Sequence, residues 1–231
     1  MEGDLDMEIV PGINVKKQKR NPTLDSDNSI YEMPFYKEPD YFFNLENYTF
    51  YIKEIERAVR RSKEYKRYVA HIKKDIGLNF CQVKGNIVED EETGKLPVLE
   101  MHHGPILTLF DCIAIVLEWS MVKGENISTL SIADRIIQEH YDHHIQTVML
   151  CETVHQEVHE FNIFLNMAMG FGDINAFLEK YKEGLLPEQI VKINRYIDLS
   201  KKYDSFDKDV MKVNDTVTKW SKEIQLDDLF D

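Results

Sequence analysis

The sequence has little cysteine, no long apolar run and no overall excess of positive charge. The most apolar stretch, residues 106–122, contains Asp111 and Glu118, so it predicts a buried helix and not a membrane span. The acidic N-terminus is not typical of a signal peptide. Three cysteines without a pairing framework fit a reducing compartment: Cys81, Cys112 and Cys151. These features predict a cytoplasmic protein with no membrane partner.

The formal net charge of -13 disfavours nucleic-acid binding across the whole surface, because phosphates repel an acidic protein. Basic residues are nevertheless concentrated in residues 51–75. Apolar residues at helical spacing, from Ile52 to Ile72, predict an amphipathic helix there, with the basic residues on its other face. That face is either a solvated surface or a phosphate-contacting one formed by Arg57, Arg60, Arg61, Lys63, Lys66 and Arg67.

The remaining pattern predicts an α+β, mostly helical protein. A composition with 43% hydrophobic and 30% charged residues is ordinary for a globular chain. We expect an extended arm (1–40), the basic amphipathic helix (41–78), a core with a helical insertion (79–168), a helical C-terminal buttress (169–223) and an acidic-apolar tail (224–231). The expected strands are 83–88, 96–101 and 145–150, and the expected helices are 106–122, 132–141, 152–166, 174–183, 187–201 and 208–223.

Histidines are crowded into one part of the chain. Seven of the eight lie between residues 102 and 159. His102 and His103 follow a predicted hairpin, whereas His155 and His159 are four residues apart on a predicted helix and so share one face. Imidazoles gathered in this way are typical of a site for one divalent ion.

Two motifs carry a family resemblance across residues 81–162. Glu100-Met101-His102-His103, with Pro105-Ile106 beyond it, and Val154-His155-Gln156-Glu157-Val158-His159 resemble the His-Me finger of HNH endonucleases, and most closely the colicin-type DNases. The resemblance implies a small ββα-metal core and a metal-dependent DNA endonuclease. A phage-encoded enzyme of this kind would act in the cytoplasm of the bacterial host.

The resemblance also implies roles for particular residues. His102, His155 and His159 would bind one Mg²⁺, Mn²⁺, Ni²⁺ or Zn²⁺ ion, and His103 would be the general base. Glu100 would orient an imidazole. Gln146 stands near the place where HNH proteins usually carry an asparagine.

Other readings remain open beside the nuclease. Cys151, four residues before His155, is compatible with a closed Cys/His zinc site that serves stability alone. The corresponding alternative function is a catalytically inactive His-Me finger, acting as a zinc-stabilised interaction or regulatory module of phage replication or transcription. A zincin protease is excluded, because Gln156 and not glutamate follows His155.

The C-terminal tail offers a candidate for partner binding. Gln225, Leu226, Leu229 and Phe230 resemble the sliding-clamp-binding motifs of replication proteins, in which such residues enter an apolar pocket of the clamp. The simpler alternative is that these apolar side chains fold back onto the domain.

Overall fold

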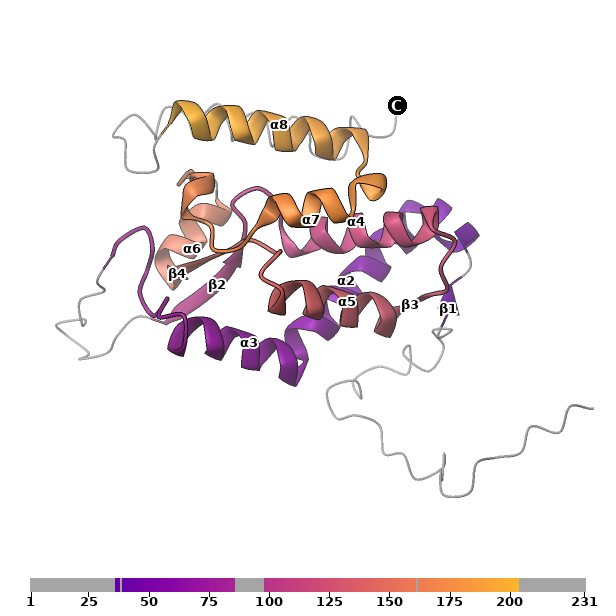
Figure 1. The fold of residues 1–231 in the computed structure, drawn as a ribbon, viewed down its shortest axis with the longest axis horizontal. Helices are drawn as coiled ribbons and strands as arrows, with labels where there is room; N and C mark the ends of the chain where they lie inside the picture. Colours follow the sequence, from indigo (N-terminus) through magenta and orange to yellow (C-terminus); the bar gives the residue numbers. More distant parts are fainter. Residues whose placement is uncertain (1–35, 38, 86–97, 161, 204–231) are drawn as a thin grey trace, which may run out of the picture. The chain divides into compact units, whose positions relative to one another are not determined.

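The computed structural model describes residues 36–37, 39–85, 98–160 and 162–203. In these ranges the chain is mostly helical, with two small two-stranded sheets (Figure 1). The elements are β1 (Tyr36–Lys37), the 3-10 helix η2 (Pro39–Phe43), α2 (Leu45–Arg61), α3 (Lys63–Lys74), β2 (Leu99–His103), α4 (Leu109–Val122), β3 (Ile127–Ser128), α5 (Thr129–Tyr141), β4 (Thr147–Cys151), α6 (Glu152–His159), η3 (Met167–Met169), α7 (Ile174–Lys180), η4 (Lys182–Gly184) and α8 (Pro187–Lys202). The chain is therefore an α+β, mostly helical protein.

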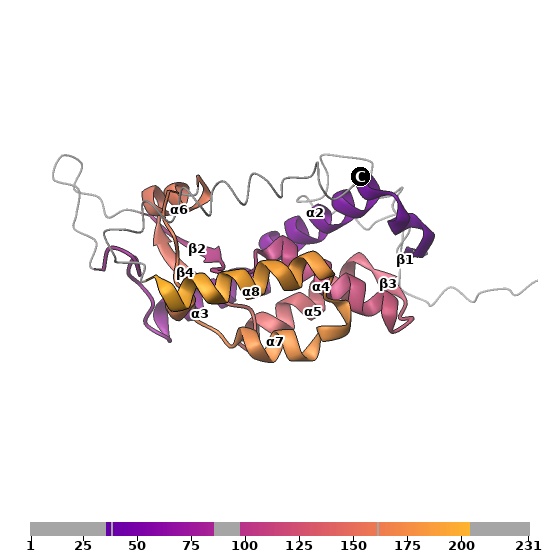
Figure 2. The ribbon, with the colours of Figure 1, turned by 90° about the horizontal axis from the view of Figure 1, so that it is seen from above.

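The α4 helix lies at the centre of the hydrophobic core. Its residues 112–117 are all buried, and it packs against α2, α5 and η4. Gly184 permits the contact with η4, because a Cβ atom there would lie 2.3 Å from the carbonyl oxygen of Ile115. On the side of α8, Lys192 Nζ donates to Asp111 Oδ2 at 2.8 Å, and α8 lies over α4 in both views (Figures 1 and 2). Within the described residues no helix is both long and apolar enough to span a bilayer.

The region predicted as one basic helix contains two helices, α2 and α3, separated at Ser62. Ser62 has an extended conformation, with φ −63° and ψ 151°. Its N–H donates to the carbonyl oxygens of Ala58 and Val59, and its hydroxyl accepts from the N–H of Tyr65. One serine thus ends the first helix and caps the second, while the apolar spacing continues across the break.

The predicted hairpin of residues 83–88 and 96–101 is wrong in its pairing. Residues 83–85 are not a strand: they belong to a turn closed by a hydrogen bond from Gly85 N–H to Cys81 O of 2.6 Å. Strand β2 pairs instead with β4, antiparallel, with Leu99 opposite Cys151 and His103 opposite Thr147. The helices α4 and α5 are an insertion between the two strands, and α6 follows β4 directly.

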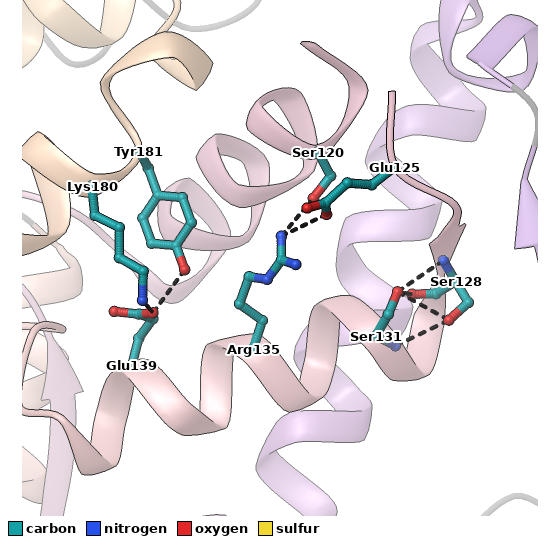
Figure 3. A network of polar contacts seen from close by, with 8 residues as sticks. All are labelled: Ser120, Glu125, Ser128, Ser131, Arg135, Glu139, Lys180 and Tyr181. Atoms are coloured by element: carbon teal, nitrogen blue, oxygen red, sulfur yellow. Dashed lines mark hydrogen bonds and ion pairs between the residues drawn. The ribbon is translucent and has the colours of Figure 1, made fainter. Parts of the chain in front are cut away.

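Several helix boundaries also differ from the prediction. The α4 helix begins at Leu109, after a capping box of Thr108 and Asp111; Pro105 lies before it, in a cis peptide bond with Gly104. The α5 helix begins three residues early, because Ser128 and not Ser131 is its N-cap (Figure 3). The α6 helix ends at His159, well short of residue 166.

The predicted C-terminal buttress consists of α7, η4 and α8. The predicted helix 208–223, most of the arm at residues 1–40 and the tail at 224–231 lie outside the described residues. The sliding-clamp contact of Gln225, Leu226, Leu229 and Phe230 therefore stays a prediction.

Candidate metal centre

Strand β2 and helix α6 bring three histidines together. His102 comes from β2, and His155 and His159 project from one face of α6. Each offers one nitrogen, and the three nitrogens all lie within 4.8 Å of one another. His155 Nε2 and His159 Nε2 are 2.9 Å apart. Zinc–nitrogen bonds of about 2.0–2.1 Å place tetrahedral ligands at similar mutual distances, so the histidine trio fits a divalent ion with small side-chain adjustments.

Glu100 fixes the orientation of one member of the trio. It precedes His102 by two residues on β2, so both side chains point to the same face of the strand. Its Oε2 lies 2.5 Å from His155 Nδ1. The carboxylate can only accept there, so His155 donates through Nδ1–H and its Nε2 lone pair faces the centre. A carboxylate behind a ligating histidine is the usual arrangement around protein-bound metals.

The electrostatics at His102 and His159 favour neutral imidazoles, which is the state that binds a metal. Burial, together with the neighbouring His155 and His159, lowers the pKa of His102 to about 3. Burial and His155 also lower the pKa of His159. His102 is buried at the base of the site, whereas His159 is exposed, so the centre opens to solvent on the α6 side. A ligand set of this kind leaves room for water or a substrate oxygen.

His103 does not join the trio, because consecutive residues of a strand point to opposite faces. It is 4% exposed and stacks on Tyr65, with ring centroids 6.0 Å apart. Its Nε2 lies 3.0 Å from Nε2 of His140, which in turn donates through Nδ1–H to the carbonyl oxygen of Ile136 at 2.7 Å. His103 must therefore donate through Nε2–H, and its Nδ1 has no partner among the residues that the structure describes. The structure separates the predicted general base from the predicted metal ligands.

The histidine pair His103–His140 was not recognised in the sequence as a unit. Burial lowers the pKa of His103 well below its ordinary value and that of His140 to about 4. The available signal was the spacing of His140, which falls four residues after the buried Ile136 and thus on the inward face of α5. A histidine in that position needs a polar partner inside the core.

Gln146 and Cys151 also lie apart from the trio. The amide of Gln146 is buried before β4 and donates to the carbonyl oxygen of Met167 at 3.0 Å. Cys151 is buried in a small apolar cluster with Cys81 and Val148. Among the described residues the close group of possible ligands thus includes neither Gln146 nor Cys151.

The predicted basic face is largely compensated by acidic neighbours on the same helices. Arg57 pairs with Glu54. Arg60 and Arg67 pair with the glutamates four and three residues before them, at 2.8 and 3.7 Å. Arg61, Lys63 and Lys66 lie on the same two helices. Pairs of this kind reduce the positive potential that a phosphate backbone would meet.

A second group of possible ligands, Glu139, Asp142 and His144, has a different explanation. The buried carboxylate of Glu139 accepts from Lys180, from Tyr181 Oη at 2.7 Å and from His144 Nδ1 at 2.7 Å. Figure 3 shows the lysine and the tyrosine converging on it. Because its oxygens already have these donors, Glu139 needs no ion, and this group is an ion-pair network between α5 and α7.

Comparison with known proteins gives one family. A model described as Bacteriophage G278-like virion protein matches residues 5–229. No curated protein and no solved structure matches the chain. The matched range includes β2 and α6, and therefore all three histidines of the candidate metal centre.

Proposed function

The chain belongs to the bacteriophage G278-like virion protein family, and from this premise we propose that it is a virion protein with a one-metal centre for phosphodiester hydrolysis. The observation that carries the proposal is the histidine trio, whose three nitrogens lie within 4.8 Å of one another. The order of antiparallel strands β2 and β4 followed directly by α6 supports it further, since that is the order a ββα-metal core requires.

The donor set indicates which ions fit. Three imidazoles favour zinc or nickel over magnesium and manganese by intrinsic affinity. When bound, such an ion lowers the pKa of a coordinated water to about 7 and stabilises negative charge on a phosphate oxygen. His102 anchors the site from its buried end, and Glu100 keeps the Nε2 atom of His155 directed at it.

The acceptor of the water proton differs from the one that the sequence predicted. His103 lies on the other face of β2, and its free Nδ1 is buried. The Glu100 side chain is 42% exposed and only one of its carboxylate oxygens is bonded to His155, so the second oxygen is open to a water molecule beside the trio. We therefore assign the general-base role to Glu100.

The test combines metal binding with cleavage. Calorimetry and elemental analysis should find about one zinc or nickel ion per chain, and plasmid nicking should depend on that ion. His102→Ala, His155→Ala and His159→Ala should each lose both properties, whereas His144→Ala, a histidine outside the trio, should lose neither. Absence of stoichiometric metal binding in the intact protein would contradict the metal centre itself.

A second function has its own support. The α6 helix has eight residues and buries one side chain, Val154, so an ion that joined it to β2 would stabilise it substantially. The net charge of -13 also disfavours an extended contact with nucleic acid. Stoichiometric zinc binding with a higher melting temperature, and no cleavage of DNA or RNA, would identify a zinc-stabilised interaction module of the virion.

A further inference from the structure

Strand β4 has a second edge, and the chain that follows α3 lies along it. In an antiparallel pair the residues bond to the neighbouring strand in alternation. The N–H of Glu152 donates to the carbonyl oxygen of Val98 at 3.1 Å, so the even-numbered residues of β4 bond to β2 and the odd-numbered ones face the other edge. There the N–H of Gln82 donates to the carbonyl oxygen of Met149 at 2.8 Å, and the N–H of Met149 donates to Gln82 Oε1 at 2.7 Å. The segment around Gln82 is therefore held against this edge by two hydrogen bonds.

Two of the three cysteines meet at the same edge. Cys81 directly precedes Gln82, and Cys151 is the next odd-numbered residue of β4 after Met149. The sulfur of Cys81 accepts hydrogen bonds from the N–H and from the thiol of Cys151. Both side chains lie in one buried apolar cluster, and both thiols are free. The fold thus brings two thiols into contact that are far apart in the sequence.

The surroundings of Cys81 favour its reactive form. Burial raises the pKa of the Cys81 thiol, but hydrogen bonds outweigh this effect and lower the pKa below its ordinary value. Besides Cys151, the donors are the N–H groups of Val83 and Lys84, in the turn that follows Cys81. The third cysteine, Cys112, lies on α4 in the other apolar cluster, and burial raises the pKa of its thiol. Because the thiolate is the nucleophile in thiol oxidation, Cys81 is the cysteine expected to react first.

We propose that Cys81 and Cys151 are an oxidation site, at which a peroxide closes an intramolecular disulfide bond. The Cys81 thiolate attacks one oxygen of hydrogen peroxide, the O–O bond breaks, and a sulfenic acid forms while hydroxide leaves and takes up a proton. The Cys151 thiolate then attacks the sulfenic sulfur, the S–S bond forms, and the oxygen leaves as a second water. Two thiols and one hydrogen peroxide give one disulfide and two waters, so the peroxide takes up the two electrons that the sulfurs lose.

The bond would connect the segment after α3 to the beginning of α6. Cys151 is the N-cap of that helix, which has one buried side chain, Val154. The bond would close a loop of about seventy residues, from Cys81 to Cys151, and so reduce the conformational freedom of the unfolded chain. Disulfides persist in oxidising settings, virions among them, and the family is that of a virion protein. The inference goes beyond the proposed function and needs no metal, because neither cysteine belongs to the histidine trio.

The test is oxidation of the full chain by hydrogen peroxide near neutral pH, with a chelator present so that the trio holds no ion. Remaining thiols are alkylated after denaturation, and intact mass and peptide mapping without reduction locate any bond. Cys81→Ser and Cys151→Ser each remove one partner, and Cys112→Ser is the matched control because it removes a buried cysteine outside the pair. Melting temperatures are measured before and after oxidation, and again after reduction with dithiothreitol.

We expect the wild type to lose the mass of two hydrogen atoms and to yield one peptide pair that joins Cys81 to Cys151, with Cys112 still open to alkylation. Its melting temperature should rise by about 5–15 °C, and dithiothreitol should reverse both changes. The Cys112→Ser variant should behave in the same way, whereas Cys81→Ser and Cys151→Ser should show no such rise.

Three results would overturn the proposal. The first is a wild-type protein that keeps three alkylatable thiols after oxidation. The second is a bond that includes Cys112 or joins two chains. The third is a gain of oxygen atoms that dithiothreitol does not reverse, since that is oxidation to sulfinic or sulfonic acid without a disulfide. None of these results bears on the metal centre, which zinc titration tests separately.

Discussion

Adjacent residues of β2 have opposite surroundings, and this alternation organises the site. Glu100 and His102 share the face that looks toward α6, where Glu100 orients His155 and His102 belongs to the histidine trio. His103 points into the core and bonds to His140. The carboxylate two positions before His102 is therefore placed to orient His155, whereas the neighbouring His103 becomes part of the packing.

The first prediction concerns Glu100. Glu100→Gln should lower zinc affinity by about 10–100-fold, because the amide holds the His155 Nδ1–H more weakly than a carboxylate does. The control is Glu152→Gln, an exposed residue in the first turn of α6 that lies outside the trio. Zinc titration by calorimetry measures the zinc affinity of both variants. Equal affinities in the two variants would show that Glu100 does not support the centre.

The second prediction concerns the pH dependence of stability. His140 has a pKa of about 4 in the folded protein, lowered by burial, against about 6.5 in an unfolded chain. Between these values the unfolded state binds more protons, so the unfolding free energy falls as the pH is lowered from 6.5 toward 4 and is fully present above 6.5. The contribution of His140 alone is about 3 kcal/mol. Urea denaturation at several pH values measures it.

The matched variant for this prediction is His140→Leu. It should be less stable at pH 7 by about 1–3 kcal/mol, because Nε2–H of His103 loses its acceptor. Its stability should also depend less on pH than that of the wild type, since one depressed imidazole has been removed. A wild-type unfolding free energy that stays constant from pH 7 to 4.5 would refute the prediction.

Local spacing predicted which histidines lie close together better than it predicted the surroundings of their neighbours. The four-residue separation of His155 and His159 fixes a common face of α6 whatever the tertiary fold. The assignment of His103 failed because a sequence does not state which face of a strand is buried. Gln146 and Cys151 were placed near the site by their distance along the chain, whereas the structure puts both into packing contacts.

At the level of elements, the bounds of a helix could be predicted where a residue such as proline marks its end. The pairing of strands that are distant in the sequence could not be predicted. The α8 helix begins at Pro187, and its 16 residues agree with the expected range within one residue. Strand β2 was located to within a few residues, but its partner β4 lies beyond an insertion of two helices. Strand pairing across such an insertion depends on the whole fold. Sequence proximity therefore favours the nearer segment, 83–88, as the partner of this strand.

The third prediction tests the network between α5 and α7 in Figure 3. Glu139→Ala should destabilise the protein by about 1–3 kcal/mol, because its removal leaves the buried Tyr181 Oη without its acceptor. The control in the same figure is Glu125→Ala, whose pair with Arg135 is partly exposed and should contribute about 0–1 kcal/mol. Urea denaturation measures the loss of unfolding free energy in each of the two variants. Equal losses would contradict the structural role given to Glu139.

On the scale of the whole molecule, a metal ion would connect parts of the chain that the backbone keeps apart. His102 and the two histidines of α6 are separated by the insertion that contains α4 and α5. An ion bound by all three would close a loop of about fifty residues and hold the short α6 helix onto β2. The described residues show no membrane-spanning helix, and the family is that of a phage virion protein.

The last prediction measures that connection. Zinc at 100 times its dissociation constant should add about 2.7 kcal/mol to the unfolding free energy and raise the melting temperature accordingly. The gain should vanish in His159→Ala, which removes an exposed ligand with little change in packing, and should persist in His144→Ala, whose imidazole contacts Glu139 instead. Hydrogen exchange should slow more in α6 than in α7 on zinc addition, because α6 carries two ligands of the trio and α7 carries none. Equal stabilisation of the wild type and His159→Ala would place the ion elsewhere. Exchange that slowed no more in α6 than in α7 would contradict a cross-link between β2 and α6.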